Sequence, residues 1–420
     1  MSDTLDTGLL RFITAGSVDD GKSTLIGRIL HDSKNLLADQ VTALDAASRK
    51  RGFAQPDLSL LTDGLLAERE QGITIDVAYR YFATPARKFI VGDSPGHVQY
   101  TRNMVTAAST ADVAILLVDA RHGLQPQTRR HAYLASWVGV PRVVLAVNKM
   151  DAVDWSRERF EAIRSAFEAM AKSLGFREVS AIPLSALLGD MVVDRGESLG
   201  WYAGPTLLEY LESVPARRDG VTGAFRFPVQ RVVRFPGAAD SSSARGYQGT
   251  VVGGRVRVGD AVSVLPAGLT AKIAAIVTAD GALPEANVDM AVTLRLDLDI
   301  DISRGDLIAS ADTVPAVTQD LAAEICWFDA ERLDPSRAYL LKHATATVKA
   351  KVAAVDHRID VDTAQPVPAT EPLAMNDIAR VRVRTQRPLG IDAYTRNRVT
   401  GAFILIDPTS YRTVAAGTLA

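Results

Sequence analysis

The chain has 420 residues, 47% of them hydrophobic and 23% charged, and this length and composition predict a globular protein of two or three domains. Its formal net charge of −2 provides no overall basic field, so a nucleic-acid partner is not expected. No apolar run approaches the roughly eighteen residues of a membrane span, and no membrane partner is expected either.

The N-terminus and the single cysteine favour a reducing, cytoplasmic location. Residues 1–6 carry acidic side chains and no basic and then apolar leader, which argues against secretion. Cys326 alone cannot form an internal disulfide or a thiolate zinc cluster. Because it lies in an apolar stretch, we expect it to be a buried packing residue.

Residues 9–215 alternate short apolar segments with helical patterns, which predicts an α/β domain with a mostly parallel sheet and helices on both faces. A helix is expected over residues 22–31, and the intervening residues 34–70 are more polar and predict a long, partly helical insertion. The expected strands are residues 9–15, 89–92, 113–118, 143–147 and 181–184.

The pattern changes after residues 214–220, where short alternating strands separated by glycine turns replace the helical periodicity. A small β-barrel is predicted first and a second all-β unit after it, with strands at 346–355 and 378–384. The expected domains are therefore residues 1–217, 221–314 and 316–420.

The first chemical motif is a phosphate-binding loop, in which two glycines separated by four residues are followed by lysine and serine. Its glycines let successive backbone N–H groups point at phosphates, and the next helix adds its positive N-terminal end. Lys22 is predicted to reach the β- and γ-phosphates of a nucleotide, and Ser23 to ligate Mg²⁺. The loop consists of Gly16, Ser17, Val18, Asp19, Asp20, Gly21, Lys22 and Ser23, with Thr24 directly after it.

The acidic pair inside this loop, Asp19 and Asp20, is open to interpretation as extra metal ligands. A simpler interpretation is favoured, in which the backbone N–H groups bind the phosphates and the two side chains adjust the shape of the loop.

A second motif follows the strand expected at residues 89–92 and consists of Asp93, Ser94, Pro95, Gly96 and His97. A carboxylate at a strand tip beside a phosphate loop can hold Mg²⁺ through water, which gives Asp93 that role. Gly96 lets its backbone approach the γ-phosphate, and His97 is the candidate for positioning the attacking water. Thr74 lies between the two motifs and is the candidate that completes the Mg²⁺ shell when the γ-phosphate is present.

A third motif, Asn148, Lys149, Met150 and Asp151, follows the strand at residues 143–147. Asp151 can accept hydrogen bonds from the N1–H and 2-amino groups of guanine, and adenine has no 2-amino group. Asn148 is expected to bond the base edge and support the phosphate loop, while the Lys149 stem covers the ring. After the next strand, a backbone N–H for the guanine oxygen is expected from Ser185, Ala186 and Leu187. Taken alone, the third motif is equally consistent with a helix-capping turn.

The ordered motifs, followed by two β-barrels, resemble the translational GTPases of the elongation-factor type. Several stretches are similar to the large, GTPase subunit of bacterial sulfate adenylyltransferase, namely residues 16–28, 70–82, 97–104 and 201–209. Ser94 stands where that family usually has threonine, and Val98 where it usually has glutamate.

The resemblance implies a regulatory GTPase with GTP and Mg²⁺ as cofactors, whose GTP hydrolysis drives formation of adenosine 5′-phosphosulfate and pyrophosphate from ATP and sulfate. It implies that a small catalytic subunit of the ATP-pyrophosphatase type performs the adenylyl transfer within a hetero-oligomer. The sequence shows one phosphate loop and no pyrophosphate-binding loop for ATP, which agrees with this division. Without a second phosphate loop before Ala420, a fused adenylylsulfate kinase is not expected.

Two alternatives stay open at this point, an elongation-factor-like GTPase that delivers aminoacyl-tRNA and an assembly GTPase of another complex. Two polar clusters in the barrels are expected to form a solvated face or a partner contact rather than a catalytic site. They are Lys342 with His343, and Tyr394, Thr395, Arg396, Asn397 and Arg398.

Overall fold

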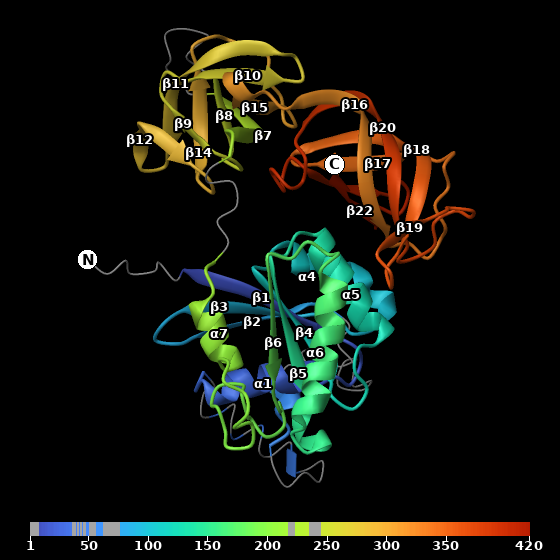
Figure 1. The fold of residues 1–420 in the computed structure, drawn as a ribbon. Helices are drawn as coiled ribbons and strands as arrows, with labels where there is room; N and C mark the ends of the chain where they lie inside the picture. The colour runs from blue at the N-terminus through green and yellow to red at the C-terminus, as the bar shows by residue number, and fades with distance from the viewer. Residues whose placement is uncertain are drawn as a thin grey trace. The chain divides into compact units, whose positions relative to one another are not determined.

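The computed structural model describes residues 8–35, 39, 42, 44, 48–49, 56–61, 76–216, 223–234 and 245–420 (Figure 1). They form two compact units, built mainly from residues 8–216 and from residues 223–420. The insertion expected at residues 34–70 lies largely outside the described residues, which include there the 3-10 helix η1 (Leu58–Leu61). None of the helices in the described ranges is both long and apolar enough to cross a membrane.

The first unit is built on one six-stranded sheet with the order β2-β3-β1-β4-β5-β6. All neighbouring strands are parallel except β2 and β3, which are antiparallel. Its strands are β1 (Leu9–Gly16), β2 (Ala78–Ala83), β3 (Lys88–Asp93), β4 (Val113–Asp119), β5 (Arg142–Asn148) and β6 (Glu178–Pro183). Every residue of β4 is buried, as expected of a central strand covered on both faces.

The expected strands of this unit are present, and the edge strand β2 is an addition that the sequence interpretation missed. Phe82 is the one buried residue of β2, the others are half-buried or exposed, and Tyr81 is 72% exposed, so β2 lacks the continuous buried run that marks the central strands. Strand β6 begins at Glu178, three residues before the predicted start, because its first half is only partly buried and carries polar side chains.

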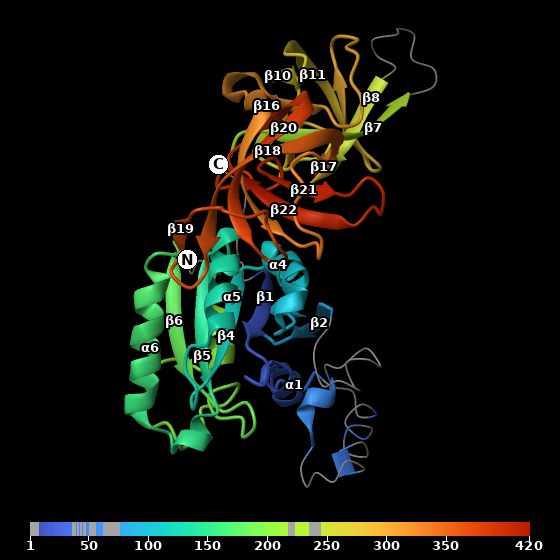
Figure 2. The ribbon, with the colours of Figure 1, turned by 90° about the vertical axis from the view of Figure 1, so that its right-hand side faces the viewer.

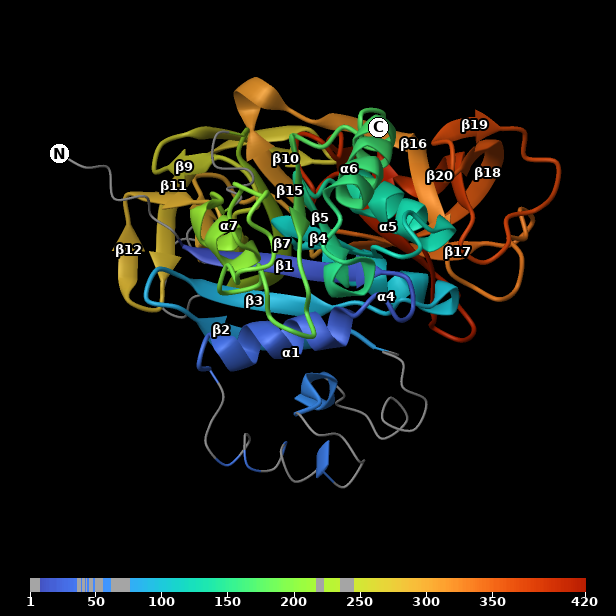
Figure 3. The same ribbon diagram turned by 60° about the horizontal axis from the view of Figure 1, so that its bottom comes forward.

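Helices cover both faces of this sheet. Leu25 and Leu211 pack with Phe12 in one core cluster on the first face, and Ala107 lies beside Ile13, whose side chain points to the other face. Figure 2 shows α6 beside β6, and Figure 3 shows α1 along the β2–β3–β1 part of the sheet. The helices are α1 (Lys22–Asp32), α4 (Thr101–Ser109), α5 (Pro126–Trp137), α6 (Arg157–Ala171) and α7 (Leu207–Ser213), with the 3-10 helices η2 (Val98–Tyr100) and η3 (Met150–Val153).

The second unit contains two β-barrels, each closed by six strands and each with its own apolar core. In the first barrel the closing pair is β10 with β11, and the strands are β7 (Arg226–Arg234), β8 (Arg245–Thr250), β10 (Ala261–Leu265), β11 (Leu269–Thr278), β14 (Ala291–Leu296) and β15 (Leu307–Ser310). Short additional strands are β9 (Arg255–Arg257), β12 (Gly281–Leu283) and β13 (Glu285–Asn287). The 3-10 helix η5 (Ala311–Thr313) follows β15.

In the second barrel β17 pairs with β18 to close the sheet. The strands are β16 (Ala316–Trp327), β17 (Tyr339–His343), β18 (Ala346–Asp360), β20 (Ile378–Ile391), β21 (Ala402–Ile406) and β22 (Thr413–Leu419), with the short β19 (Gln365–Val367) beside β18. Strands β18 and β20 continue beyond their predicted ends, because register shifts let their pairing follow the curve of the barrel. The predicted fold class is confirmed, and Cys326 is buried in β16 as expected.

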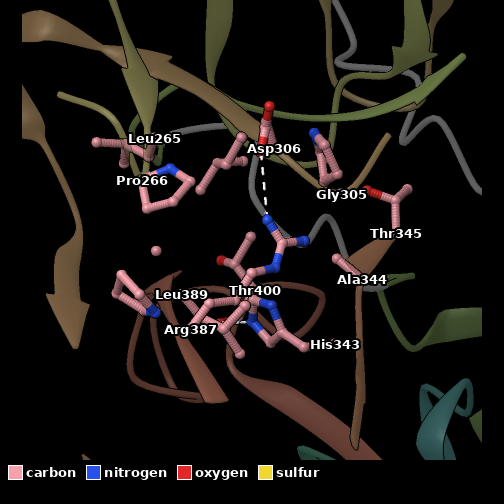
Figure 4. Close-up of a pocket in the computed structure, with 14 residues that line it drawn as sticks. Leu265, Pro266, Gly305, Asp306, His343, Ala344, Thr345, Arg387, Leu389 and Thr400 are labelled. Carbon is pink, nitrogen blue, oxygen red and sulfur yellow. Dashed lines mark hydrogen bonds and ion pairs between the residues drawn. The ribbon is translucent and has the colours of Figure 1, made fainter. Parts of the chain in front are cut away.

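The two barrels are joined by polar contacts, of which the pair between Arg226 and Asp392 is buried. The Arg226 guanidinium makes two hydrogen bonds, of 2.8 and 2.9 Å, to the Asp392 carboxylate, which also accepts one of 2.6 Å from Thr400 Oγ1. His343 bonds the Thr400 carbonyl, and Figure 4 shows Arg387 of the second barrel directed at Asp306 of the first, with an ion pair of 3.6 Å.

The expectation of a solvated face or a partner contact fails for one residue in each polar cluster, His343 and Asn397, whereas Thr395 and Arg396 are exposed as expected. His343 is 5% exposed and Asn397 is 9% exposed, and Asn397 Nδ2 donates to the Val252 carbonyl of the first barrel. Only Lys342 of the first cluster is exposed. The sequence pattern is misleading here because polar side chains that join two barrels look the same as polar side chains that face water.

Candidate guanine-nucleotide site

The predicted site segments follow the carboxyl ends of β1, β3, β5 and β6, which lie at one edge of the sheet because these strands are parallel. A cavity of about 340 Å³ opens there. The phosphate loop, the turn after β3 and the segment after β5 all contribute to its wall. Its lining consists of Val18, Asp19, Gly21, Lys22, Ser23, Thr24, Ser59, Gly96, His97 and Lys149. Thr74 lies outside the described residues.

The phosphate loop adopts a backbone path that requires its glycines. Gly16 and Gly21 have φ angles of 151° and 96°, in the region that side chains disfavour. A Cβ atom on Gly16 would lie 2.7 Å from the Leu117 carbonyl oxygen, and one on Gly21 would lie 2.5 Å from Asn148 Nδ2. The loop is therefore closed in from two sides, and its path depends on these two positions.

The two acids of the loop differ in their surroundings. Asp20 is buried, and its carboxylate accepts a hydrogen bond of 2.6 Å from the Ser17 N–H. Burial raises the pKa of Asp20, and the Ser17 N–H and the Lys22 charge partly oppose this effect. Asp19 is exposed and has a φ of 65°. The Asp20 side chain thus shapes the loop, which agrees with the simpler of the two interpretations.

Lys22 is buried at the floor of the cavity. Its ammonium donates hydrogen bonds to the carbonyl oxygens of Gly16, at 3.2 Å, and Ser17, at 2.6 Å. Burial lowers the pKa of Lys22, while the nearby Asp93 carboxylate acts in the opposite direction. A Cβ atom on Gly96 would lie 2.6 Å from Lys22 Nζ. The backbone of the turn after β3 can therefore lie this close to the lysine only because residue 96 is a glycine.

The turn after β3 is held against β1. Asp93 is 2% exposed and accepts a hydrogen bond of 3.1 Å from Thr14 Oγ1, and the Ser94 N–H donates to the Thr14 carbonyl at 3.2 Å. Pro95 is buried, whereas His97 is exposed on the cavity wall with its ring 6.2 Å from the Tyr100 ring. The turn thereby fixes the backbone of its first residues and leaves the imidazole free to face the cavity.

The oxygen donors beside Lys22 fit a hard divalent cation. Ser23 lines the cavity with a hydroxyl group, and the buried Asp93 provides a carboxylate close to the phosphate loop. Within the described part of the chain, no group of three or more His, Cys, Asp or Glu side chains could hold a metal ion. The donors present suit Mg²⁺, whose protein sites commonly combine one or two protein oxygens with substrate phosphates.

Asn148 joins two loops. Its Nδ2 donates to the Asp20 carbonyl of the phosphate loop at 2.8 Å, and its Oδ1 accepts the Ala186 N–H at 2.9 Å. Lys149 has a left-handed φ of 60°, and its ammonium donates to the Asp19 carbonyl at 2.6 Å. The segment after β5 is therefore attached to the phosphate loop by two side chains.

The other residues predicted to contact the base are not part of the cavity lining. Asp151 lies in η3, and its Oδ1 is buried without a hydrogen-bond partner. Met150 is fully buried, and its N–H donates to the Leu184 carbonyl at 3.3 Å. The Ser185 N–H donates to the Asp190 carbonyl at 3.1 Å, whereas Leu187 is 60% exposed.

Three residues that sequence reasoning missed contact these segments. Asp119 ends β4 and pairs with Arg121 and Lys149. Arg28 of α1 donates to the carbonyl oxygens of Ala186, at 3.2 Å, and Leu187. Buried in α5, His131 accepts the N–H of Gly16. An acid at a strand tip was a usable signal for Asp119, whereas no local pattern marks Arg28 or His131.

The pKa of Asp119 shows how strongly this acid is held. Its burial favours the neutral form, but hydrogen bonds from Arg121 and Lys149 outweigh burial and hold the pKa of Asp119 below its ordinary value. Asp119 is therefore ionised across the physiological pH range, as a partner for two cations.

Comparison with known proteins defines the class first. Residues 8–216 match the description "Elongation factor Tu GTP binding domain", and residues 320–420 match "GTP-eEF1A C-terminal domain-like". The first unit is thus a GTP-binding domain of the elongation-factor-Tu type, a class that binds guanine nucleotide.

Proteins that are similar to this chain over nearly its whole length identify its family within this class. The chain is 54% identical to "Bifunctional enzyme CysN/CysC" of Mycobacterium tuberculosis over 98% of its own length and 67% of the relative. It is 53% and 50% identical to "Sulfate adenylyltransferase subunit 1" of Methylorubrum populi and of Saccharophagus degradans, over 97% of this chain and 86% of each relative. The chain belongs to the sulfate adenylyltransferase subunit 1 family.

This membership confirms the predicted family and does not favour the tRNA-delivery alternative. A solved structure of sup35 complexed with GMPPNP aligns with 100% of this chain and 95% of the sup35 chain, at 24% identity and a TM-score of 0.43. This similarity carries no argument for the assignment.

Proposed function

We propose that the chain binds GTP with Mg²⁺ in the cavity beside Lys22 and hydrolyses it as the regulatory subunit of a sulfate adenylyltransferase. The observation that carries this proposal is the meeting of three segments around one cavity. The phosphate loop, the turn at Gly96 and the segment after β5 all line it. They supply, in order, groups for phosphates, for the γ-phosphate end and for a base.

In this proposal the base is read by Asp151. Its buried Oδ1 has no hydrogen-bond partner in the protein, and a buried acceptor of this kind favours a ligand that donates to it. Guanine offers the N1–H and the 2-amino group, whereas adenine offers no 2-amino group. Leaving a buried carboxylate unpaired is costly, so the preference for guanine is expected to be strong.

The phosphates lie against the backbone N–H groups of the phosphate loop and the Lys22 ammonium. Mg²⁺, when bound, would neutralise phosphate charge, with Ser23, Thr74 and Asp93 as its proposed protein ligands. Gly96 brings its N–H close to the γ-phosphate position. His97 orients the attacking water from the cavity wall, since it is the exposed side chain that follows this turn.

In this proposal, GTP hydrolysis in this chain drives a reaction that a partner subunit catalyses. Relatives named subunit 1 indicate a second subunit, and we propose a small catalytic subunit of the ATP-pyrophosphatase type in a cytoplasmic hetero-oligomer. There, ATP and sulfate form adenosine 5′-phosphosulfate and pyrophosphate. Sulfate is a weak nucleophile and the product is a mixed anhydride, so the reaction is uphill and requires a driving step. We further propose that the chain works as three domains, residues 1–217, 221–314 and 316–420.

The test is GTP dependence of the reconstituted complex. With ATP and sulfate, formation of adenosine 5′-phosphosulfate is expected to rise when GTP is added and to stay low with GDP or a non-hydrolysable GTP analogue. GTP hydrolysis is expected to be slow in the isolated chain and faster with the partner and its substrates. A complex that forms the product equally well without GTP would refute the coupling.

A further inference from the structure

A buried imidazole lies beneath the phosphate loop. His131 projects from α5 and has no exposed surface. Its Nδ1 lies 3.0 Å from the backbone nitrogen of Gly16, which donates the hydrogen bond. Gly16 and His131 are 115 residues apart in the chain, so this bond ties the end of β1 to a helix that has no other part in the nucleotide cavity.

The hydrogen-bond pattern fixes the form of the ring. Because Gly16 N–H donates to Nδ1, the neutral imidazole carries its proton on Nε2. The side-chain amide nitrogen of Gln127, one turn earlier in α5, lies 2.8 Å from Nε2, and turning this amide by half a turn brings its oxygen there to accept the proton. Burial, followed by the charges of Lys22 and Arg130, lowers the pKa of His131 to about 3, so Nδ1 remains an acceptor near neutral pH.

The bond acts on a residue that also contacts Lys22, the lysine proposed to bind the phosphates. Gly16 is held at both ends of its backbone, with its N–H bonded to His131 and its carbonyl accepting from Lys22 Nζ at 3.2 Å. Its φ of 151° is accessible mainly to glycine, and a glycine has no side chain that could restrain the backbone at this position. Without the imidazole, the buried N–H would lack a partner and the peptide would be free to turn.

We propose that His131 is a positioning residue of the phosphate loop, which holds Gly16 so that the Gly16 carbonyl and the Lys22 ammonium keep the geometry that phosphates require. This inference rests on the proposed function, because it assigns His131 to the binding of a nucleotide through its phosphates. His131 touches neither nucleotide nor metal in this arrangement and acts through Gly16.

The test compares His131→Leu with His131→Asn in the full-length chain. Leucine fills the space and removes the acceptor, whereas the asparagine oxygen takes the place of Nδ1. His131→Leu is expected to weaken binding of fluorescent GDP and GTP by about fivefold or more, and His131→Asn to restore it to within about twofold. The preference for guanine over xanthine nucleotide is expected to be unchanged, since the base lies elsewhere.

The outcomes separate the inference from the function on which it rests. Wild-type affinity in His131→Leu, or equal losses in both variants, would overturn the inference while GTP binding stands. Failure of the wild-type chain to bind GDP would reject the proposed function and the inference together. If His131→Leu does not fold, His131→Gln replaces it, because its oxygen reaches the Nε2 position and leaves Gly16 unbonded. Equal affinities of His131→Gln and His131→Asn would again overturn the inference.

Discussion

The Lys149 ammonium lies 3.0 Å from the Asp119 carboxylate, and the two residues sit at the carboxyl ends of neighbouring parallel strands. Asp119 therefore holds the lysine whose stem is proposed to cover the base. Asp119→Asn is expected to weaken GDP binding by about fivefold, because the lysine loses its charged partner. Stopped-flow release of fluorescent GDP measures the effect.

Arg121→Ala is the matched control for this prediction. It removes the other, half-exposed partner of Asp119 and leaves the pair with Lys149 in place, so a change of less than about twofold is expected. Equal effects of the two substitutions would show that the pair with Lys149 has no particular role in binding.

Asp151→Asn is expected to change the base that is bound. The asparagine amide can donate to the 2-oxo group of xanthine but no longer accepts both guanine donors, so XTP is expected to bind better than GTP. Competition between the two nucleotides measures the preference, with the wild-type chain as the control. A variant that still strongly prefers GTP would contradict the proposed role of Asp151.

His97→Ala is expected to separate binding from hydrolysis. The imidazole lines the cavity but lies on its exposed wall, so GTP affinity is expected to stay within about twofold of wild type. Single-turnover hydrolysis is expected to slow by about a hundredfold, as is common for a lost water-positioning group. An unchanged rate constant would remove His97 from the mechanism.

Acid is expected to destabilise the first unit through His131. The pKa of His131 is about 3 in the folded protein, below the ordinary value of 6.5. Between pH 6.5 and pH 3, His131 is therefore protonated in the unfolded chain and neutral in the folded protein. The free energy of unfolding therefore falls as the pH decreases from 6.5 towards 3. The expected loss between pH 7 and pH 5 is about 2 kcal/mol.

His131→Asn removes this titration and leaves the other histidines unchanged. Its free energy of unfolding is expected to fall by about 2 kcal/mol less than that of the wild type over the same interval. Urea unfolding followed by tryptophan fluorescence measures it, since three of the four tryptophans, Trp137, Trp155 and Trp201, are in this unit. The same pH dependence in both proteins would contradict a neutral, buried His131.

Arg226→Ala is expected to destabilise the second unit by about 3 to 5 kcal/mol, because it leaves the Asp392 carboxylate buried without its cation. Arg384→Ala breaks the exposed pair with Asp320 and is expected to cost less than about 1 kcal/mol. Trp327 is the one tryptophan in residues 223–420 and reports the unfolding of this unit. Similar effects of the two substitutions would argue against a buried ion pair between the barrels.

The fold was predictable where its signal is local. The phosphate loop, the continuous apolar strands and the glycine turns of the barrels each lie within about a dozen residues, so their patterns can be read directly. Strand β2 was missed because Tyr79 and Tyr81 face outward at the edge of the sheet. Edge strands of this kind carry no continuous apolar run.

The site was predictable to the same extent. Gly16 and Asp151 stand in motifs with recognisable spacing, whereas His131 and Arg28 reach the same loops from helices, through contacts between residues more than 100 positions apart. Such contacts depend on how the helices pack on the sheet, which a single sequence does not display. The buried role of His343 was missed for the same reason.

The contacts of the Asn148 amide couple the binding of the phosphates to the binding of the base. One side chain bonds the Asp20 carbonyl and the Ala186 N–H, so the phosphate loop and the loop beside the base share a single support. Ordering either loop lowers the entropic cost of ordering the other, and this linkage is reciprocal by thermodynamic necessity. The binding free energies of a base without phosphates and of pyrophosphate without a base are therefore expected to add up to less than the binding free energy of the intact nucleotide.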